Sequence, residues 1–196
     1  MDKGLHWVNQ WQGEDVVCIA SGPSLTVEQV EYVRGKARVI AVNDNYKLAP
    51  WADAIYACDH RWWSCHIDQA RHTQAQLWSM DESACRDYGL RYVHAVRQDG
   101  FSTEAGVICH GTNSGYQAMN LAYQFGASRI ILIGYDCQHT GGKRHWFGDH
   151  PKGWGNANMV SRWLQSYNSV VCPIPIINCT LDTALSFPMA RLEDVL

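Results

Sequence analysis

The chain has no excess of positive charge. Its 196 residues contain 16 Lys and Arg against 19 Asp and Glu, which gives a formal net charge of −3 at pH 7. A protein that holds nucleic acid through its phosphates carries a strong positive excess or a basic stripe. Neither occurs here, so we do not expect nucleic acid as a partner.

Long apolar runs are also absent. No stretch of about 18 consecutive apolar residues occurs, so the sequence predicts no membrane span. The first residues lead into Trp7 and Trp11 without the apolar core of a signal peptide. Together these absences predict a cytoplasmic protein.

The spacing typical of zinc sites is missing, although the chain has eight cysteines. No C-x-x-C pair occurs, and the cysteines and histidines between residues 58 and 72 follow no common zinc pattern. Several of the cysteines lie in strand-like apolar runs, as Cys18 and Cys179 do. We therefore expect buried, reduced thiols and no metal site.

What the sequence does have is an apolar run that leads into a turn of small residues. Residues 15–20 (DVVCIA) have the composition of a buried strand, and Ser21, Gly22, Pro23 and Ser24 follow before a helical pattern begins. In open α/β sheets, ligands bind outside the carboxyl ends of the strands, where the amino end of a helix favours an anion. This turn has neither the P-loop pattern nor G-x-G-x-x-G. A plain strand-to-helix turn without a ligand is the alternative.

The rest of the chain continues the alternation of strand and helix. Apolar runs predict strands over 38–42, 52–58, 129–135 and 174–178, and an alternating pattern predicts one over 90–96. Residues 107–110 are expected to be a short strand or a loop. Periodic patterns predict a helix that starts after Thr26, with Gln29 completing a capping box, and helices over 113–125 and 156–167. One or two more helices are expected within 61–87. This order predicts a single α/β domain with a mostly parallel sheet flanked by helices.

Polar side chains follow several of the predicted strands. Asn43, Asp44 and Asn45 follow residues 38–42, and Asp136 follows 129–135. A long polar and aromatic loop over 137–155 contains His145 and His150, and a histidine side chain suits a general base at neutral pH. Turn-forming Asn and Asp residues and solvated surface histidines are the alternatives.

Aromatic and basic side chains gather near the same predicted edge. Lys143 and Arg144 lie beside the histidines in the sequence and would neutralise a phosphate; solvated charges of the loop are the alternative. The tryptophans that we consider for stacking on a ligand ring are Trp62, Trp63, Trp146 and Trp154. Packing in the core is the alternative for each of them.

In this order, the G-P-S-L turn, Asn43, T-N-S-G, G-Y-D and the histidine loop resemble a known group of proteins. They are similar to bacterial sialyltransferases that use CMP-sialic acid and carry a GPSL-type first turn. They are also similar to a wider group of GPSL-containing Rossmann-like proteins. That group includes archaeal-type 6-hydroxymethyl-dihydropterin diphosphokinases, flagellin-modifying glycosyltransferase-like proteins and short phage-encoded relatives. The resemblance covers about residues 16–178 in motif order.

The resemblance implies roles for individual residues. It implies a single Rossmann-like nucleotide-binding domain over 1–196, with an extension over 1–14 and an active-site loop over 137–155. The nucleotide-binding residues that it implies are Ser21, Gly22, Pro23, Ser24, Asn43, Thr112, Asn113, Ser114 and Gly115. It implies catalytic roles for Asp136 and for His150 as the base on the acceptor hydroxyl. His145 is the second choice, because Asp149 interrupts the matching motif.

The function implied first is a transferase that uses a nucleotide-activated donor, of sialyltransferase-like glycosyltransferase type. Its partners would be a nucleotide or nucleotide-sugar donor and a small-molecule or glycan acceptor, and it would need no metal cofactor. One alternative is a Mg²⁺-dependent ATP diphosphokinase in which Asp136 and another carboxylate hold the metal. Another is a non-catalytic nucleotide-binding protein, such as a phage accessory protein. The oligomeric state, including a homo-oligomer, stays open.

Overall fold

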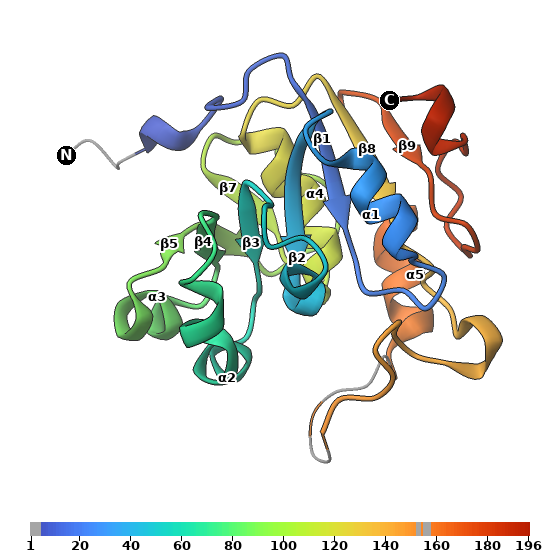
Figure 1. The fold of residues 1–196 in the computed structure, drawn as a ribbon. Coiled ribbons are helices and arrows are strands. Elements are labelled where there is room, and N and C mark those ends of the chain that lie inside the picture. Colours follow the sequence, from blue (N-terminus) through green and yellow to red (C-terminus); the bar gives the residue numbers. More distant parts are fainter. Residues whose placement is uncertain (1–4, 152–153, 155–157) are drawn as a thin grey trace.

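The fold is built around one parallel β-sheet (Figure 1). A computed structural model describes residues 5–151, 154 and 158–196. The seven strands of the sheet are β1 (Asp15–Ile19), β2 (Arg38–Val42), β3 (Ala54–Tyr56), β4 (Gln76–Ser79), β5 (Arg91–Tyr92), β8 (Arg129–Ile133) and β9 (Ile176–Asn178). Their order is β5-β4-β3-β2-β1-β8-β9, and every neighbouring pair is parallel. A second, two-stranded parallel sheet pairs β6 (His94–Val96) with β7 (Val107–Cys109).

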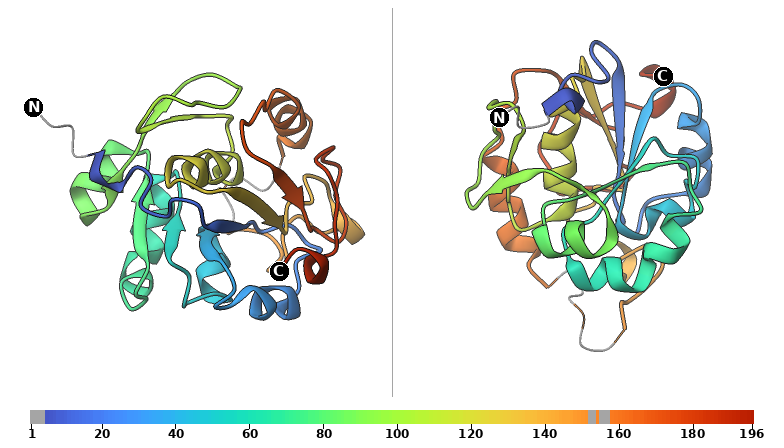
Figure 2. Two further views of the ribbon diagram at one scale, coloured as in Figure 1. Left: turned by 90° about the horizontal axis from the view of Figure 1, so that it is seen from above. Right: turned by 90° about the vertical axis from the view of Figure 1, so that its left-hand side faces the viewer.

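Helices cover both faces of the large sheet, as Figure 2 shows. The α-helices are α1 (Val27–Val33), α2 (His60–Ala70), α3 (Glu82–Tyr88), α4 (Ser114–Gln124) and α5 (Val160–Asn168). Short 3₁₀ turns are η1 (Leu5–Trp7), η2 (Asn43–Lys47), η3 (Thr140–Gly142) and η4 (Leu192–Asp194). The helices α4 and α5 pack on one face with the small sheet, and α1, α2 and α3 pack on the other. The predicted Rossmann-like α/β domain is confirmed.

Alternating side chains of β1 supply both cores. Val16 and Cys18 belong to the core under α4, whereas Val17 and Ile19 belong to the core under α1 and α2. All four are fully buried. A strand that is buried on both faces needs apolar side chains at every position. The central strands could therefore be predicted from continuous apolar runs in the sequence.

The capping box predicted at the first helix forms only in part. Thr26 caps α1, because its Oγ1 accepts a hydrogen bond from the backbone N–H of Gln29 at 3.2 Å. The side chain of Gln29 does not return to Thr26. Its Nε2 instead donates to the carbonyl oxygen of Cys179 at 2.9 Å and ties α1 to the chain after β9.

Three predicted elements need correction. Residues 61–87 contain the strand β4 between α2 and α3, and not helices alone. The predicted strand over 90–96 is two strands, because buried Val93 donates its N–H to Ser79 and the chain then leaves the large sheet for the small one. The helix predicted from residue 156 begins at Val160, after turn residues at 158 and 159, and residues 155–157 lie outside the described chain.

The strand order creates a switch point between β1 and β8. From β1 the chain builds outward through β2, β3, β4 and β5, and the later strands β8 and β9 extend the sheet the other way. The connections therefore lead to opposite faces on the two sides of this point, which leaves a crevice at the carboxyl ends of β1 and β8. No helix of the described residues is long and apolar enough to cross a membrane. All eight cysteines are free thiols.

Candidate functional site

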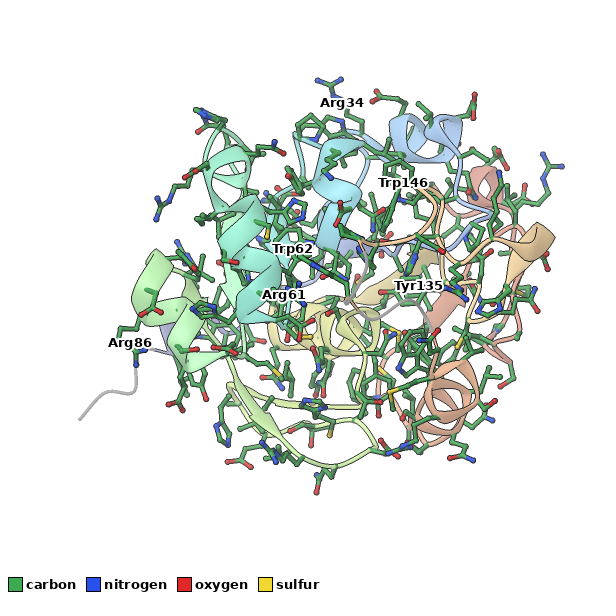
Figure 3. All side chains as sticks on the ribbon, turned by 90° about the horizontal axis from the view of Figure 1, so that it is seen from below. Arg34, Arg61, Trp62, Arg86, Tyr135 and Trp146 are labelled. Carbon is green, nitrogen blue, oxygen red and sulfur yellow. The ribbon has the colours of Figure 1, made fainter. Side chains whose placement is uncertain are left out.

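A cavity of about 610 Å³ opens at the switch point. We call it the switch-point cavity, and its walls come from the ends of β1, β2, β3 and β8, the start of α4, parts of α2 and α5, and the loop after β8. Figure 3 looks at this edge, with Arg61, Trp62, Tyr135 and Trp146 around its centre. The predicted site residues that line it are Ser21, Gly22, Pro23, Asn43, Thr112, Asn113, Ser114, Gly115, Asp136, His145 and His150. Among the residues predicted to bind the nucleotide or to act in catalysis, Ser24 is the one that does not line it.

Ser24 is turned toward Asp136. The backbone N–H of Ser24 donates to Asp136 Oδ2 at 2.9 Å, and its hydroxyl donates to Oδ1 at 2.7 Å. The hydroxyl of Thr140 donates to Oδ2 at 2.7 Å. Burial raises the pKa of Asp136, although the hydrogen bonds from Thr140 and Ser24 oppose that shift. Both carboxylate oxygens therefore hold the first turn to the chain that follows β8.

Gly22 is required by the same contact. A Cβ on Gly22 would lie 2.0 Å from Asp136 Oδ1 and 2.5 Å from the carbonyl oxygen of Gly134. Its N–H donates to that carbonyl at 2.8 Å. The helix α1 has seven residues and starts only at Val27. Packing against the end of β8 thus accounts for the glycine, and phosphate binding by this turn stays a prediction.

Left-handed backbone conformations gather at the cavity. Asn43, Thr112 and Cys137 have φ values of 50°, 57° and 49°, and all three line the cavity. Within the described chain the only other non-glycine residue with positive φ is Asn9. Asparagine tolerates this conformation, whereas a β-branched threonine is strained in it. Such strain concentrates at functional sites in proteins, because the surrounding structure must hold it in place.

The amino end of α4 forms one wall. Asn113 caps the helix, and its Oδ1 accepts hydrogen bonds from the N–H of Tyr116 at 3.1 Å and the hydroxyl of Tyr167 at 3.0 Å. Ser114 and Gly115, the first two residues of the helix, line the cavity. The positive end of the helix dipole therefore faces it, which favours an anionic ligand group.

Cys58 lies under this wall and is hydrogen-bonded to it. The hydroxyl of Ser114 donates to its Sγ at 3.1 Å. Burial raises the pKa of the Cys58 thiol to about 12, and the nearby charge of Asp59 adds to the effect. The thiol is therefore protonated at neutral pH, and only a thiolate attacks an electrophile efficiently.

Trp146 anchors the histidine loop to the strand ends. Its Nε1 donates to Asn45 Oδ1 at 2.8 Å, and its backbone N–H donates to the Ser21 carbonyl at 3.2 Å. Asn45 is fully buried, and its Nδ2 donates to the carbonyl oxygens of Ile19 and Val42 and to the hydroxyl of Ser21. From the sequence, Asn45 was considered as a contact for ribose or phosphate, with a turn residue as the alternative. It joins the ends of β1 and β2 to the loop.

His145 has its tautomer fixed by the loop. Its Nδ1 lies 3.2 Å from the carbonyl oxygen of Gly148. A carbonyl can only accept, so Nδ1 carries the hydrogen and Nε2 is left as a proton acceptor. The ring stacks on Phe147, with ring centres 4.9 Å apart and planes 4° apart. Burial and the neighbouring His150 lower the pKa of His145, which keeps the ring neutral at pH 7.

His150 lies next to His145, with ring centres 4.8 Å apart. It also stacks on Trp154 at 5.7 Å. Burial lowers the pKa of His150 as well. Two rings this close disfavour simultaneous protonation, because their charges would repel.

Two of the predicted stacking tryptophans cannot present a ring face. Trp63 is fully buried and donates its indole N–H to the Ala57 carbonyl. Trp62 is 3% exposed, lies stacked on His66 with ring centres 4.4 Å apart, and donates its N–H to Asp44 at 2.8 Å. Burial raises the pKa of Asp44, but hydrogen bonds from Lys47 and Trp62 outweigh it and hold the pKa below its usual range. Trp62 is thus a fixed part of the wall.

The sequence analysis missed other residues of the cavity. Trp163 and Tyr167, both on α5, line it, as do Cys58 and Cys137. No local motif marked them, because which face of α5 meets the cavity depends on how that helix packs on α4. The positive charges at the cavity are Arg61, whose guanidinium lies over the Trp154 ring at 4.8 Å, and Arg144, which pairs with Asp149 at 3.4 Å.

No group of three or more His, Cys, Asp or Glu side chains is placed to hold a metal ion anywhere in the described part of the chain. Comparisons with protein-family models, with curated proteins and with solved structures find no match to this chain. Assignment of a function therefore depends on the fold, on the geometry of the switch-point cavity and on the order of the motifs.

Proposed function

We propose that the protein is a transferase that binds a nucleotide-activated donor in the switch-point cavity and uses a histidine of the following loop as general base. The observation that carries this proposal is the fixed tautomer of His145 beside a cavity at the switch point of a parallel sheet. The narrower assignment, glycosyl transfer of sialyltransferase-like type, rests on the order of the motifs.

The amino end of α4 is the better place for the leaving phosphate. Its dipole and the N–H groups of its first turn favour an anion, and Arg61 and Arg144 add positive charge at the cavity. In the turn after β1, by contrast, the N–H groups of Gly22 and Ser24 are already bonded to Gly134 and Asp136. A cavity of about 610 Å³ falls within the range of pockets that hold small-molecule ligands and cofactors.

His145 is our first choice for the base, ahead of His150. In the proposed reaction the acceptor hydroxyl transfers its proton to His145 Nε2 while its oxygen bonds to the transferred group. The bond from that group to the nucleotide phosphate breaks, and the phosphate leaves with the bonding electrons toward α4. A neutral imidazole with a defined tautomer is suited to this step. The N–H at Nδ1 stays hydrogen-bonded to the carbonyl oxygen of Gly148 throughout the reaction.

The hydrogen bonds of Asp136 favour the transferase hypothesis over the diphosphokinase hypothesis. The diphosphokinase alternative would use it as a magnesium ligand, whereas its carboxylate accepts three hydrogen bonds that hold the first turn in place. A metal would have to replace bonds on which the shape of the cavity depends. We therefore place the transferase first.

The proposal is tested by a thermal-shift panel of CMP, UDP, GDP, ADP, ATP and CMP-sialic acid, each with and without Mg²⁺. A ligand that binds the folded state raises the melting temperature by mass action. We expect a rise with at least one nucleotide that does not depend on Mg²⁺. A rise with ATP that requires Mg²⁺ would favour the diphosphokinase, and no rise with any compound would contradict nucleotide binding altogether.

A further inference from the structure

We infer that Trp163 is the platform on which the base of the donor nucleotide stacks. This inference rests on the proposed function. It adds that the cavity recognises the flat base of the donor nucleotide by its shape. Trp163 lies on α5 and lines the cavity with a half-buried ring. Among the residues that the structure describes, no aromatic ring stacks on it, whereas Trp62 is covered by His66 and Trp154 by His150.

The ring of Trp163 is held in one orientation. Its Nε1 donates to the carbonyl oxygen of Thr112 at 3.0 Å. The accepting carbonyl belongs to Thr112, whose φ of 57° is one of the left-handed values found at the cavity. An aromatic side chain that is already ordered loses little conformational freedom when a ligand binds, which makes it an effective stacking surface.

The same hydrogen bond places the ring next to the anion-binding wall. Thr112 immediately precedes Asn113, the cap of α4, and Ser114 and Gly115 follow at the positive end of the helix. A nucleotide joins a planar base to a phosphate through one sugar. A phosphate at α4 therefore leaves the base within reach of Trp163. Stacking accepts any base, because every base has a π-face, so we expect both purine and pyrimidine nucleotides to use this platform.

The first test measures dissociation constants by titration calorimetry for CMP, AMP and ribose 5-phosphate, which has the phosphate but no base. Trp163→Leu removes the ring, and Trp163→Phe keeps a ring but loses the N–H. Trp51 lies outside the cavity, with Arg34 over its ring, and Trp51→Leu is the matched control. We expect Trp163→Leu to raise the dissociation constants of CMP and AMP at least about fivefold. Ribose 5-phosphate binding should not change, Trp163→Phe should stay near wild type, and Trp51→Leu should have no effect.

A second readout uses the wild-type protein, so it does not depend on how well a variant folds. The chain has nine tryptophans, and the indole N–H resonance that disappears in Trp163→Phe identifies Trp163. Addition of CMP or AMP should shift this resonance in the wild type, and ribose 5-phosphate should not. Nucleotide binding that leaves this resonance in place and has equal affinity in Trp163→Leu would overturn the inference and keep the proposed function. Equal weakening of ribose 5-phosphate would also overturn it. Failure of the wild type to bind any nucleotide would overturn both.

Discussion

The hydroxyl of Ser24 donates to Asp136 Oδ1 at 2.7 Å, across 112 residues of sequence. This bond and the one from the Ser24 N–H fasten the turn after β1 to the chain after β8. The two strands are neighbours in the sheet, so the contact joins two segments that both contribute residues to the lining of the switch-point cavity. The residues of the predicted phosphate turn thus have a structural role that can be measured apart from any ligand.

Removal of the hydrogen bond from the Ser24 hydroxyl to Asp136 should destabilise the protein. Ser24→Ala should lower the free energy of unfolding by about 1–2 kcal/mol, because Asp136 loses a hydrogen bond while it stays buried. Urea denaturation at pH 7 gives the value. Ser64 is exposed, and its hydroxyl contacts only the Arg61 carbonyl and the Sγ of the neighbouring Cys65, so Ser64→Ala is the control and should change stability by less than about 0.5 kcal/mol. Equal effects of the two substitutions would contradict a stabilising role of the hydrogen bond between Ser24 and Asp136.

Gly22→Ala should lower the free energy of unfolding more than a glycine substitution that introduces only backbone strain. The new Cβ would meet Asp136 Oδ1 at 2.0 Å, so the turn and β8 must move apart. We expect a loss of about 3 kcal/mol or more in the free energy of unfolding. Gly35 has a φ of +73° with open space around it, and Gly35→Ala should cost only about 1 kcal/mol. Thermal and urea denaturation of both variants makes the comparison. A mild Gly22→Ala would show that the turn is not packed as described.

The anchor between Trp146 and Asn45 predicts a contrast between two tryptophans. Trp146→Phe leaves Asn45 Oδ1 without its donor and should cost about 1–2 kcal/mol of stability. The indole N–H of Trp51 is buried without a partner, so Trp51→Phe should be neutral or slightly stabilising. Denaturation midpoints of the two variants, measured side by side, test the sign of each effect. Destabilisation by Trp51→Phe equal to that of Trp146→Phe would show that lost packing explains both.

The stability of the protein should depend on pH through His145. Burial lowers its pKa in the folded state, so the unfolded chain binds more protons once the pH falls below about 6.5. This histidine therefore favours the folded state fully above that pH, and its contribution is lost as the pH falls toward the folded-state value. His145→Gln should lose less stability than wild type between pH 7 and pH 5. Urea denaturation at both pH values makes the comparison, and equal losses in His145→Gln and wild type would contradict this origin of the pH dependence.

The sequence predicted the fold where burial makes a strand uniformly apolar. Residues 38–42 form β2 with the expected limits, and 129–135 contain β8. The strand β4 was missed, because Gln76 and Ser79 flank only two apolar residues and polar residues precede it. Which strands pair, and where the chain changes sheets at Val93, depends on tertiary contacts that no local pattern contains.

The site was predictable where it lies at strand ends. Turn residues such as Asn43 and Asp136 line the same cavity because the carboxyl ends of parallel strands share one edge. The direction of each side chain was not predictable. Ser24 faces Asp136, a partner 112 residues away in the sequence, and Trp62 is covered by His66, about one turn further along α2. Trp163 has no motif of its own and enters the site through the packing of α5 on α4.

Donor turnover by wild type, His145→Gln and His150→Gln, with the nucleotide donor selected by the thermal-shift panel, shows whether His145 is the general base. Release of nucleotide and transfer of the donor group are followed at saturating donor, and donor affinity is measured for each variant. We predict that His145→Gln lowers kcat about 100-fold or more with little change in donor affinity, because a general base contributes a factor of about 10²–10⁴. Wild-type turnover by His145→Gln would contradict the proposed role of this histidine.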